Sequence, residues 1–290
     1  MARGSSGTAQ LRYPGDARPS AMTSPRTPPD FSRPLVTVDV VIFTVRADAL
    51  QVLLVRRPDG PDEPFPGRWA LPGGFVDMAR DATLLDCALR KLREKTGAVT
   101  PYLEQLGSWG GATRDPRGWS ATHCFYALLP APSVTLEKGD DVAPTLPASR
   151  GSLPPEGALA AVGRPGGGDA AQVAWFGADA AARKRLAFDH AQILAAALER
   201  LRGKVEYTSL PAFLLEEPFT LPALQQAYET VLGRLVDKSA FRKRMLDGGF
   251  LEEAGMLPAA AGRPAMGWRL RDRARPAFFP RTFLNAPAAG

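Results

Sequence analysis

A double glycine followed by a long amphipathic segment is the sequence feature that most constrains the fold. Trp69-Ala-Leu-Pro-Gly-Gly-Phe-Val predicts a short strand that runs into a glycine loop. Residues 81–96 follow as a helix, with Asp81 expected at its N-cap and Gly97 where a left-handed residue ends a helix. The apolar positions expected on its buried face are Leu85, Ala88, Leu89 and Leu92. This segment predicts a strand, a loop and a helix that packs by one face.

Strands are predicted on both sides of this segment. Runs of β-branched and apolar residues indicate strands at 35–43, 52–55, 103–109, 123–129 and 173–176, the first two separated by a polar break at 46–49. A helix is expected over 189–202, with Asp189 at its N-cap. Residues 132–169 are rich in Gly, Pro and Ala and are interpreted as an inserted surface loop.

The C-terminal part of the chain has a different pattern. Thr220 is expected to cap a helix over 221–232, which Gly233 ends, and a second helix follows over 238–247. Two strand-like runs then begin at Phe250 and Gly267, around a loop at 255–265. Helix, short turn, helix and a two-stranded wing is the winged variant of the helix-turn-helix.

Length and composition agree with two globular domains. The chain has 290 residues, of which 45% are hydrophobic and 23% charged, and its net charge is +6. We expect a disordered tail at 1–34, a first domain at 35–204, a second at 205–275 and a tail at 276–290. We expect no signal peptide or membrane span, and therefore the cytoplasm. Cys87 and Cys124 lie in apolar patterns and are interpreted as core residues, with no disulfide or zinc site.

The loop and helix resemble a Nudix box, and Arg90-Lys-Leu-Arg-Glu-Lys-Thr-Gly97 carries the resemblance. The resemblance implies an α+β fold, an α/β/α sandwich with a mixed sheet. In that family the helix glutamates hold Mg²⁺ or Mn²⁺, which polarises a diphosphate for attack by water. Here the three glutamate positions hold Lys91, Glu94 and Lys95, which share one helical face. Two ammonium groups oppose a divalent cation, so we expect no metal, no cofactor and no catalytic residue.

Several assignments near this helix stay open. Asp77 or Asp81 could replace a lost metal ligand, or they are a turn residue and an N-cap. Lys91 and Lys95 could hold a diphosphate directly, with Glu94 in the same cleft, or they are solvated surface lysines.

A second stretch, Arg114-Asp-Pro-Arg-Gly-Trp119, is similar to one that lies near the ligand in Nudix proteins acting on ADP-ribose and related dinucleotides. Arg114 and Arg117 suit phosphate and Trp119 could stack on a base, but the stretch is also an ordinary turn. His123 and His190 are lone histidines, and Asp189-His190 is interpreted as a helix cap rather than a metal ligand pair.

Basic residues gather on the second helix of the C-terminal pair. Phe241 and Met245 supply its apolar face, so other side chains point outward and can reach guanine edges or phosphates in a major groove. The expected DNA-binding residues are Lys238, Ser239, Arg242, Lys243 and, at the tip of the wing, Arg263. The alternative is a solvated basic face.

The order of the two domains is similar to that of the Nudix-related transcriptional regulators of the NrtR type. The stretches that begin at Phe219 and Asp237 and the Gly262-Arg-Pro turn carry this resemblance. The resemblance implies a homodimeric repressor on a palindromic operator of NAD-metabolism or sugar-utilisation genes, released by ADP-ribose or a related phosphorylated nucleotide or sugar. Ser239 and the insertion at 132–169 depart from the family pattern. The alternatives are a metal-dependent hydrolase of ADP-ribose or nucleotide sugars, and a module whose winged helix docks a protein.

Overall fold

The computed structural model describes residues 33–97, 99–131, 159–162, 171–258 and 263–279. Residues 1–32 of the predicted tail and most of the predicted insertion lie outside the described residues. Four residues of that insertion, 159–162, form a strand instead of a surface loop, because their backbone pairs with the strand at 171–177.

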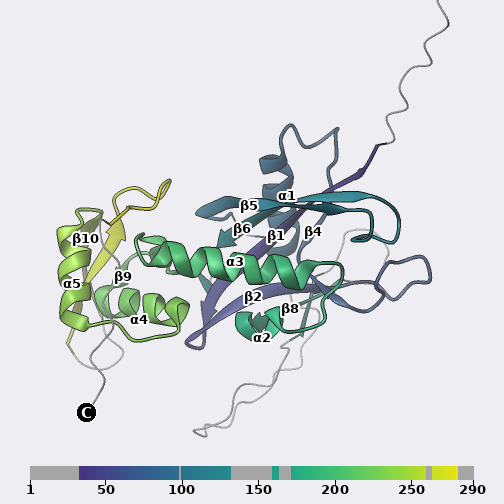
Figure 1. Cartoon of the computed structure of the whole chain (residues 1–290). Helices are drawn as coiled ribbons and strands as arrows, with labels where there is room; N and C mark the ends of the chain where they lie inside the picture. Colours follow the sequence, from purple (N-terminus) through teal and green to yellow (C-terminus); the bar gives the residue numbers. More distant parts are fainter. Residues whose placement is uncertain (1–32, 98, 132–158, 163–170, 259–262, 280–290) are drawn as a thin grey trace, which may run out of the picture. The chain divides into compact units, whose positions relative to one another are not determined.

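The first domain is built around one eight-stranded mixed sheet (Figure 1). Its elements are β1 (Leu35–Arg46), β2 (Ala49–Arg56), β3 (Trp69–Ala70), β4 (Gly73–Phe75), α1 (Leu84–Thr96), β5 (Tyr102–Gly111), β6 (Ser120–Leu128), β7 (Leu159–Val162), β8 (Ala171–Gly177), α2 (Ala178–Ala182) and α3 (His190–Val205). The strand order is β5-β6-β1-β2-β8-β7, while β3 pairs with β2 and β4 with β1. Only the β1–β6 pairing among these is parallel.

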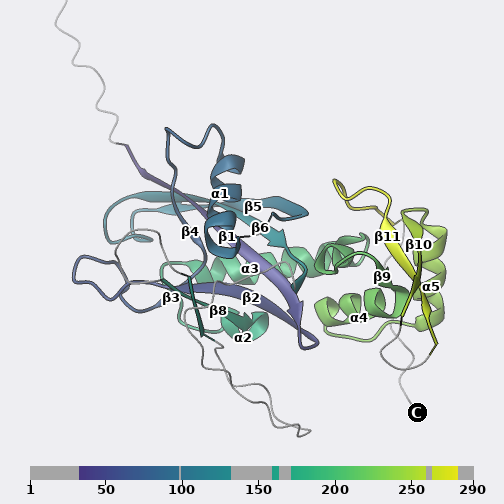
Figure 2. The ribbon, with the colours of Figure 1, turned by 180° about the vertical axis from the view of Figure 1, so that it is seen from behind.

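Successive side chains of β1 point to opposite faces of the sheet, and both faces are buried. Val38, Val40 and Ile42 face the cluster that contains Leu92 of α1, whereas the intervening Val41 and Phe43 belong to the cluster under α2 and α3. Figure 1 shows α3 in front of the sheet, and Figure 2 shows α1 on the opposite face. The predicted α/β/α sandwich is therefore confirmed.

Helix α1 begins later than predicted. Thr83, not Asp81, is its N-cap, because Thr83 and Asp86 satisfy each other's backbone N–H groups in a capping box. Leu85, which was expected on the buried face, is 47% exposed, and Leu89 is only half-buried. The buried residues of α1 are Cys87, Ala88, Leu92 and Thr96. The C-terminal end is as predicted, with Gly97 at φ 66°.

The second domain is a winged helix. Its elements are η2 (Leu210–Leu214), β9 (Phe219–Thr220), α4 (Leu221–Leu232), α5 (Lys238–Asp247), β10 (Leu251–Leu257) and β11 (Ala265–Leu270). Thr220 caps α4 and Gly233 ends it at φ 68°, as predicted. The wing has a third strand that was not predicted, since β9 pairs with β11. The backbone of Phe279 donates to Tyr207, so this domain continues into residues expected in the tail.

The two domains share contacts along α3. Arg202 Nε donates to the Val231 carbonyl of α4 at 3.0 Å, and Arg234 Nη2 lies 2.7 Å from Glu206 Oε1. Residues of α3, η2 and α4 also belong to one buried apolar cluster. In the described part of the chain, no helix is long and apolar enough to cross a bilayer.

Candidate functional site

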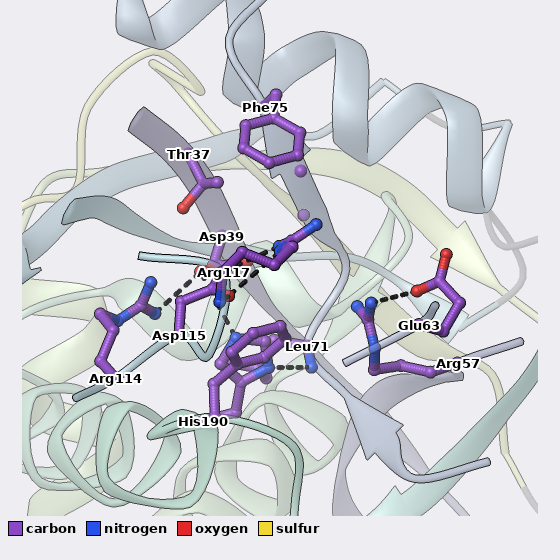
Figure 3. Close-up of a pocket in the computed structure, with 13 residues that line it drawn as sticks. Thr37, Asp39, Arg57, Glu63, Leu71, Phe75, Arg114, Asp115, Arg117 and His190 are labelled. Atoms are coloured by element: carbon purple, nitrogen blue, oxygen red, sulfur yellow. Dashed lines mark hydrogen bonds and ion pairs between the residues drawn. The ribbon is translucent and has the colours of Figure 1, made fainter. Parts of the chain in front are cut away.

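A cavity of about 190 Å³ lies where β1, β4, the β5–β6 loop and the start of α3 meet (Figure 3). Its lining is formed by Thr37, Asp39, Arg57, Glu63, Leu71, Gly73, Gly74, Phe75, Arg114, Asp115, Arg117, Phe188 and His190. Most of these side chains are polar or charged, so the cavity suits a polar ligand more than an apolar one.

Asp39 is one of two buried acids that line the cavity, and Asp115 is the other. Thr122 Oγ1 donates to Asp39 Oδ2 at 2.8 Å, and His190 Nε2 lies 3.5 Å from the same oxygen. Burial raises the pKa of Asp39, but His190, Thr122 and Arg114 lower it more, and the balance lies below the ordinary value. His190 Nδ1 accepts a hydrogen bond from the Leu71 N–H at 2.9 Å, which fixes the ring with Nε2 toward Asp39.

Arg114 links the β5–β6 loop to the start of α3. Its Nε and Nη2 donate to the two carboxylate oxygens of Asp189 at 2.9 and 2.7 Å, and Nη2 lies 3.7 Å from Asp39 Oδ2. Burial alone would lower the pKa of Arg114, whose side chain is 8% exposed, but the two carboxylates raise it. Asp189 stands at the expected N-cap position, yet its carboxylate pairs with Arg114 and makes no capping hydrogen bond.

The other two arginines of the cavity are paired as well. Arg117 Nη2 donates to Asp115 Oδ2 at 2.8 Å and its guanidinium lies 5.1 Å from the centre of the Phe75 ring. Arg57 Nη2 lies 2.5 Å from Glu63 Oε2. Each positive charge in the cavity therefore already has a carboxylate partner.

Two glycines bring the backbone close to the cavity. A Cβ on Gly73 would lie 1.9 Å from Asp39 Oδ1, and Gly74 has a φ of 147° that side chains rarely adopt. A Cβ on Gly74 would lie 3.0 Å from Lys91 Nζ, which places this lysine beside the edge of the cavity. The double glycine thus leaves room for Asp39 on one side and Lys91 on the other.

The outward face of α1 does not fit the metal of a catalytic Nudix box. Glu94 lies 3.0 Å from Arg90 Nη1, 3.6 Å from Lys91 Nζ and 3.7 Å from Arg80 Nη2. Burial raises the pKa of Glu94, but these cations lower it more, so the carboxylate is ionised and already neutralised. A hard divalent cation needs several clustered oxygen ligands. Among the described residues, no group of three or more His, Cys, Asp or Glu is placed to hold one.

Asp81 does not rescue the metal site. Its carboxylate is buried and accepts hydrogen bonds from Arg90 Nε at 2.7 Å and from the Asp77 N–H at 2.9 Å. The Arg90 guanidinium, opposed by burial, holds the pKa of Asp81 well below its usual range. Asp81 therefore orients Arg90 and the loop before α1, and is neither a cap nor a ligand.

The structure separates the residues that the sequence grouped as a ligand site. Arg114 and Arg117 line the cavity, Lys91 lies at its edge, and Glu94 and the half-buried Lys95 lie further along α1. Trp119 is 52% exposed outside the lining. Sequence reasoning missed Asp39, Asp115, His190, Phe188, Arg57 and Glu63. A carboxylate inside the apolar run 36–43 was a signal for Asp39, whereas its partners come from distant segments.

The second candidate surface is α5. Phe241 and Met245 are buried as predicted, with Phe241 edge-on to Tyr228 at 5.2 Å. The side chains expected to face outward are exposed, and they are Lys238, Ser239, Arg242 and Lys243. Lys243 Nζ lies 2.7 Å from Asp247 Oδ2 in an exposed pair, and Arg263 on the wing is also exposed. An exposed cationic helix beside a wing has the geometry that enters a major groove.

Fold and sites together define a class of protein, a Nudix domain whose described residues do not fit the metal, joined to a DNA-binding winged helix. Residues 34–197 match the model of the NUDIX domain, and residues 211–270 match that of the NrtR DNA-binding winged helix domain. The chain belongs to the NrtR family of Nudix-related transcriptional regulators. The family resemblance and the two-part fold predicted from the sequence are confirmed.

Similar proteins span nearly the same length. The chain is 40% identical over 240 residues to the ADPR responsive transcriptional repressor NtrR of Acinetobacter baylyi. These 240 residues cover 83% of each protein. The crystal structure of Shewanella oneidensis NrtR is 37% identical with a TM-score of 0.68, over 86% of this chain and 99% of that one. The structure of the same protein complexed with a 27mer DNA is 37% identical with a TM-score of 0.69, over 85% and 98% of the two chains.

Proposed function

We propose that this chain is a transcriptional repressor that binds double-stranded DNA through α5 and the wing, and that ADP-ribose binding to the Nudix domain weakens its hold on DNA. The observation that carries the proposal is the exposed cationic face of α5, set on a buried apolar one. The A. baylyi relative is named an ADPR responsive repressor, and the S. oneidensis relative has been crystallised with DNA.

The DNA contacts are proposed for Lys238, Ser239, Arg242 and Lys243 of α5, and for Arg263 of the wing. A helix in the major groove reads base edges with side chains near its start, while arginine on a wing reaches backbone or minor groove. Two winged helices are needed for a palindromic operator, so the active species is proposed to be a homodimer in the cytoplasm. The operator of NAD-metabolism genes is the first to test.

The effector site is proposed to be the cavity with Arg114 and Arg117, extended along its open side by Lys91 and Trp119. Guanidinium forks hold phosphate oxygens in two-point contacts, and an exposed indole stacks on an adenine. Hydrolysis is not part of the proposal, because Glu94 and its three cations do not fit a divalent metal. ADP-ribose that is bound without being consumed can report its own concentration.

The test is a titration of the full chain onto labelled DNA from its own upstream region, over a salt series, with and without ADP-ribose. We expect sequence-specific binding that weakens steeply with salt and weakens further with ADP-ribose. An unrelated duplex of equal length is the control for specificity. Equal affinity for both duplexes at every salt concentration would contradict the proposal, and Mg²⁺-dependent turnover of ADP-ribose would favour a hydrolase.

A further inference from the structure

Helix α3 reaches from the cavity to the winged helix. His190, its first residue, lines the cavity and accepts the Leu71 N–H. Near its other end, Arg202 donates to the Val231 carbonyl of α4, and Glu206, the residue after α3, pairs with Arg234. A helix of 16 residues rises about 24 Å, so α3 is a rigid element long enough to join the two places.

The start of α3 is held in an unfavourable conformation. Phe188 has a φ of 53°, which a bulky residue adopts only where its surroundings impose it. Asp189 is among the best N-cap residues, yet its side chain makes no capping hydrogen bond to α3. Its carboxylate is committed to Arg114 instead. A change of partner at Arg114 would therefore release both the strained residue and the capping group.

Among the described residues, Arg114 is the only paired arginine of the cavity that is joined to the start of α3. Arg117 pairs with Asp115, two residues away in its own loop, and Arg57 pairs with Glu63 in the β2–β3 connection. Arg114 reaches 75 positions along the chain to Asp189. A phosphate accepts the guanidinium fork in the same two-point geometry as a carboxylate, so a bound diphosphate and Asp189 compete for this side chain.

We propose that the Arg114–Asp189 pair is the switch that couples the effector to DNA binding: a phosphate of the ligand takes Arg114 from Asp189, and the freed start of α3 rearranges. This inference rests on the proposed function and adds the path by which ligand binding in the cavity reaches the winged helix. It makes Asp189 a positioning residue that acts through Arg114, without touching the ligand. The ligand class is that of the proposed function, a nucleotide whose diphosphate can offer Arg114 a pair of oxygens.

The experiment compares the full chain with Asp189→Asn in two titrations, ADP-ribose onto the free protein and labelled operator DNA onto the ligand-free protein. Without its competitor, Arg114 is more available, so Asp189→Asn should bind ADP-ribose about tenfold more tightly, the effect of one charge-assisted hydrogen bond. Its DNA affinity without ADP-ribose should fall to that of the effector-bound wild type. A variant that merely damages the fold would weaken both titrations, which separates the two explanations.

Three further variants complete the design. Asp59→Asn removes the carboxylate of the exposed Arg56–Asp59 pair outside the cavity, and both affinities should match the wild type. Arg202→Ala, at the far end of α3, should keep the ADP-ribose affinity while reducing the effect of ADP-ribose on DNA affinity. Asp189→Ser, which keeps a capping side chain, replaces Asp189→Asn if the latter does not fold.

The outcomes distinguish the two proposals. If ADP-ribose does not change the DNA affinity of the wild type, the proposed function and the switch are both overturned. The switch alone is overturned by a different outcome. In that outcome ADP-ribose lowers the DNA affinity of the wild type, and a folded Asp189→Asn binds ADP-ribose no more tightly and loses DNA affinity by the same factor.

Discussion

Removal of two exposed cations from α5 gives the most quantitative test of the DNA-binding surface. Lys238 and Arg242 are exposed one helical turn apart, and no ion pair between either side chain and a carboxylate is found among the described residues. Alanine is the best helix former, so Lys238→Ala and Arg242→Ala should leave α5 intact. The buried side chains beneath them, Phe241 and Met245, are unchanged.

The magnitude follows from counterion release. Removing one cation that binds a phosphate makes the slope of log K against log salt shallower by about 0.9. The double variant removes two cations per chain and four per dimer, so the slope should become shallower by about 3.6. Between 50 and 200 mM salt, the wild type should then lose about 100-fold more affinity than the double variant.

Fluorescence anisotropy of labelled operator DNA over that salt range measures both slopes. Arg185→Ala is the matched control, because it removes an exposed cation from the first domain. Its slope should equal that of the wild type. If the double variant instead kept the affinity and the salt slope of the wild type, Lys238 and Arg242 would not contact DNA, and the assignment of α5 would be refuted.

Three other perturbations test the site and the fold. Asp39→Asn should lower the free energy of unfolding measured in urea at neutral pH, and its difference from the wild type should shrink below about pH 4. The pKa of Asp39 is lowered in the folded state, so the ionised carboxylate stabilises the fold above the unfolded-state pKa of 3.8, and this stabilisation is lost in acid. An equal difference at pH 7 and pH 3 would contradict this. Lys91→Glu with Lys95→Glu should create a three-carboxylate face that Mg²⁺ stabilises in thermal unfolding, whereas the wild-type midpoint should not move with Mg²⁺. Phe241→Ala should destabilise the winged helix by about 3–5 kcal/mol, and an unchanged thermal midpoint would show that Phe241 is not a core residue.

Local signals in the sequence were sufficient for the winged helix. Thr220, Gly233 and the apolar pair Phe241 and Met245 each act within a turn or two of helix, so capping and periodicity locate α4 and α5. The strand β9 was missed because two residues carry no periodicity and form a strand only by pairing with β11. The late start of α1 was present in the sequence as the spacing of Thr83 and Asp86 but was not recognised.

The cavity depends on contacts that a single sequence does not reveal. Thr122 reaches Asp39 across 83 positions, and Arg114 reaches Asp189 across 75. Charge type alone indicated that Arg114 suits phosphate, but it did not indicate that a carboxylate already holds it. The same applies to Arg234, whose Nη2 lies 2.7 Å from Glu206 Oε1 at the end of α3.

In the proposed function, the pairing of these cations explains how the cavity can respond to a phosphate ligand. If the arginines of the cavity were unpaired, any phosphate would bind them, and the ligand would have no arrangement to displace. In the proposed switch, ligand binding must break the Arg114–Asp189 contact to make another, so the two arrangements differ in ligand affinity. That difference is the only means by which a ligand can shift a conformational equilibrium. By linkage, DNA bound to α5 must weaken the hold on the effector by the same factor by which the effector weakens the hold on DNA.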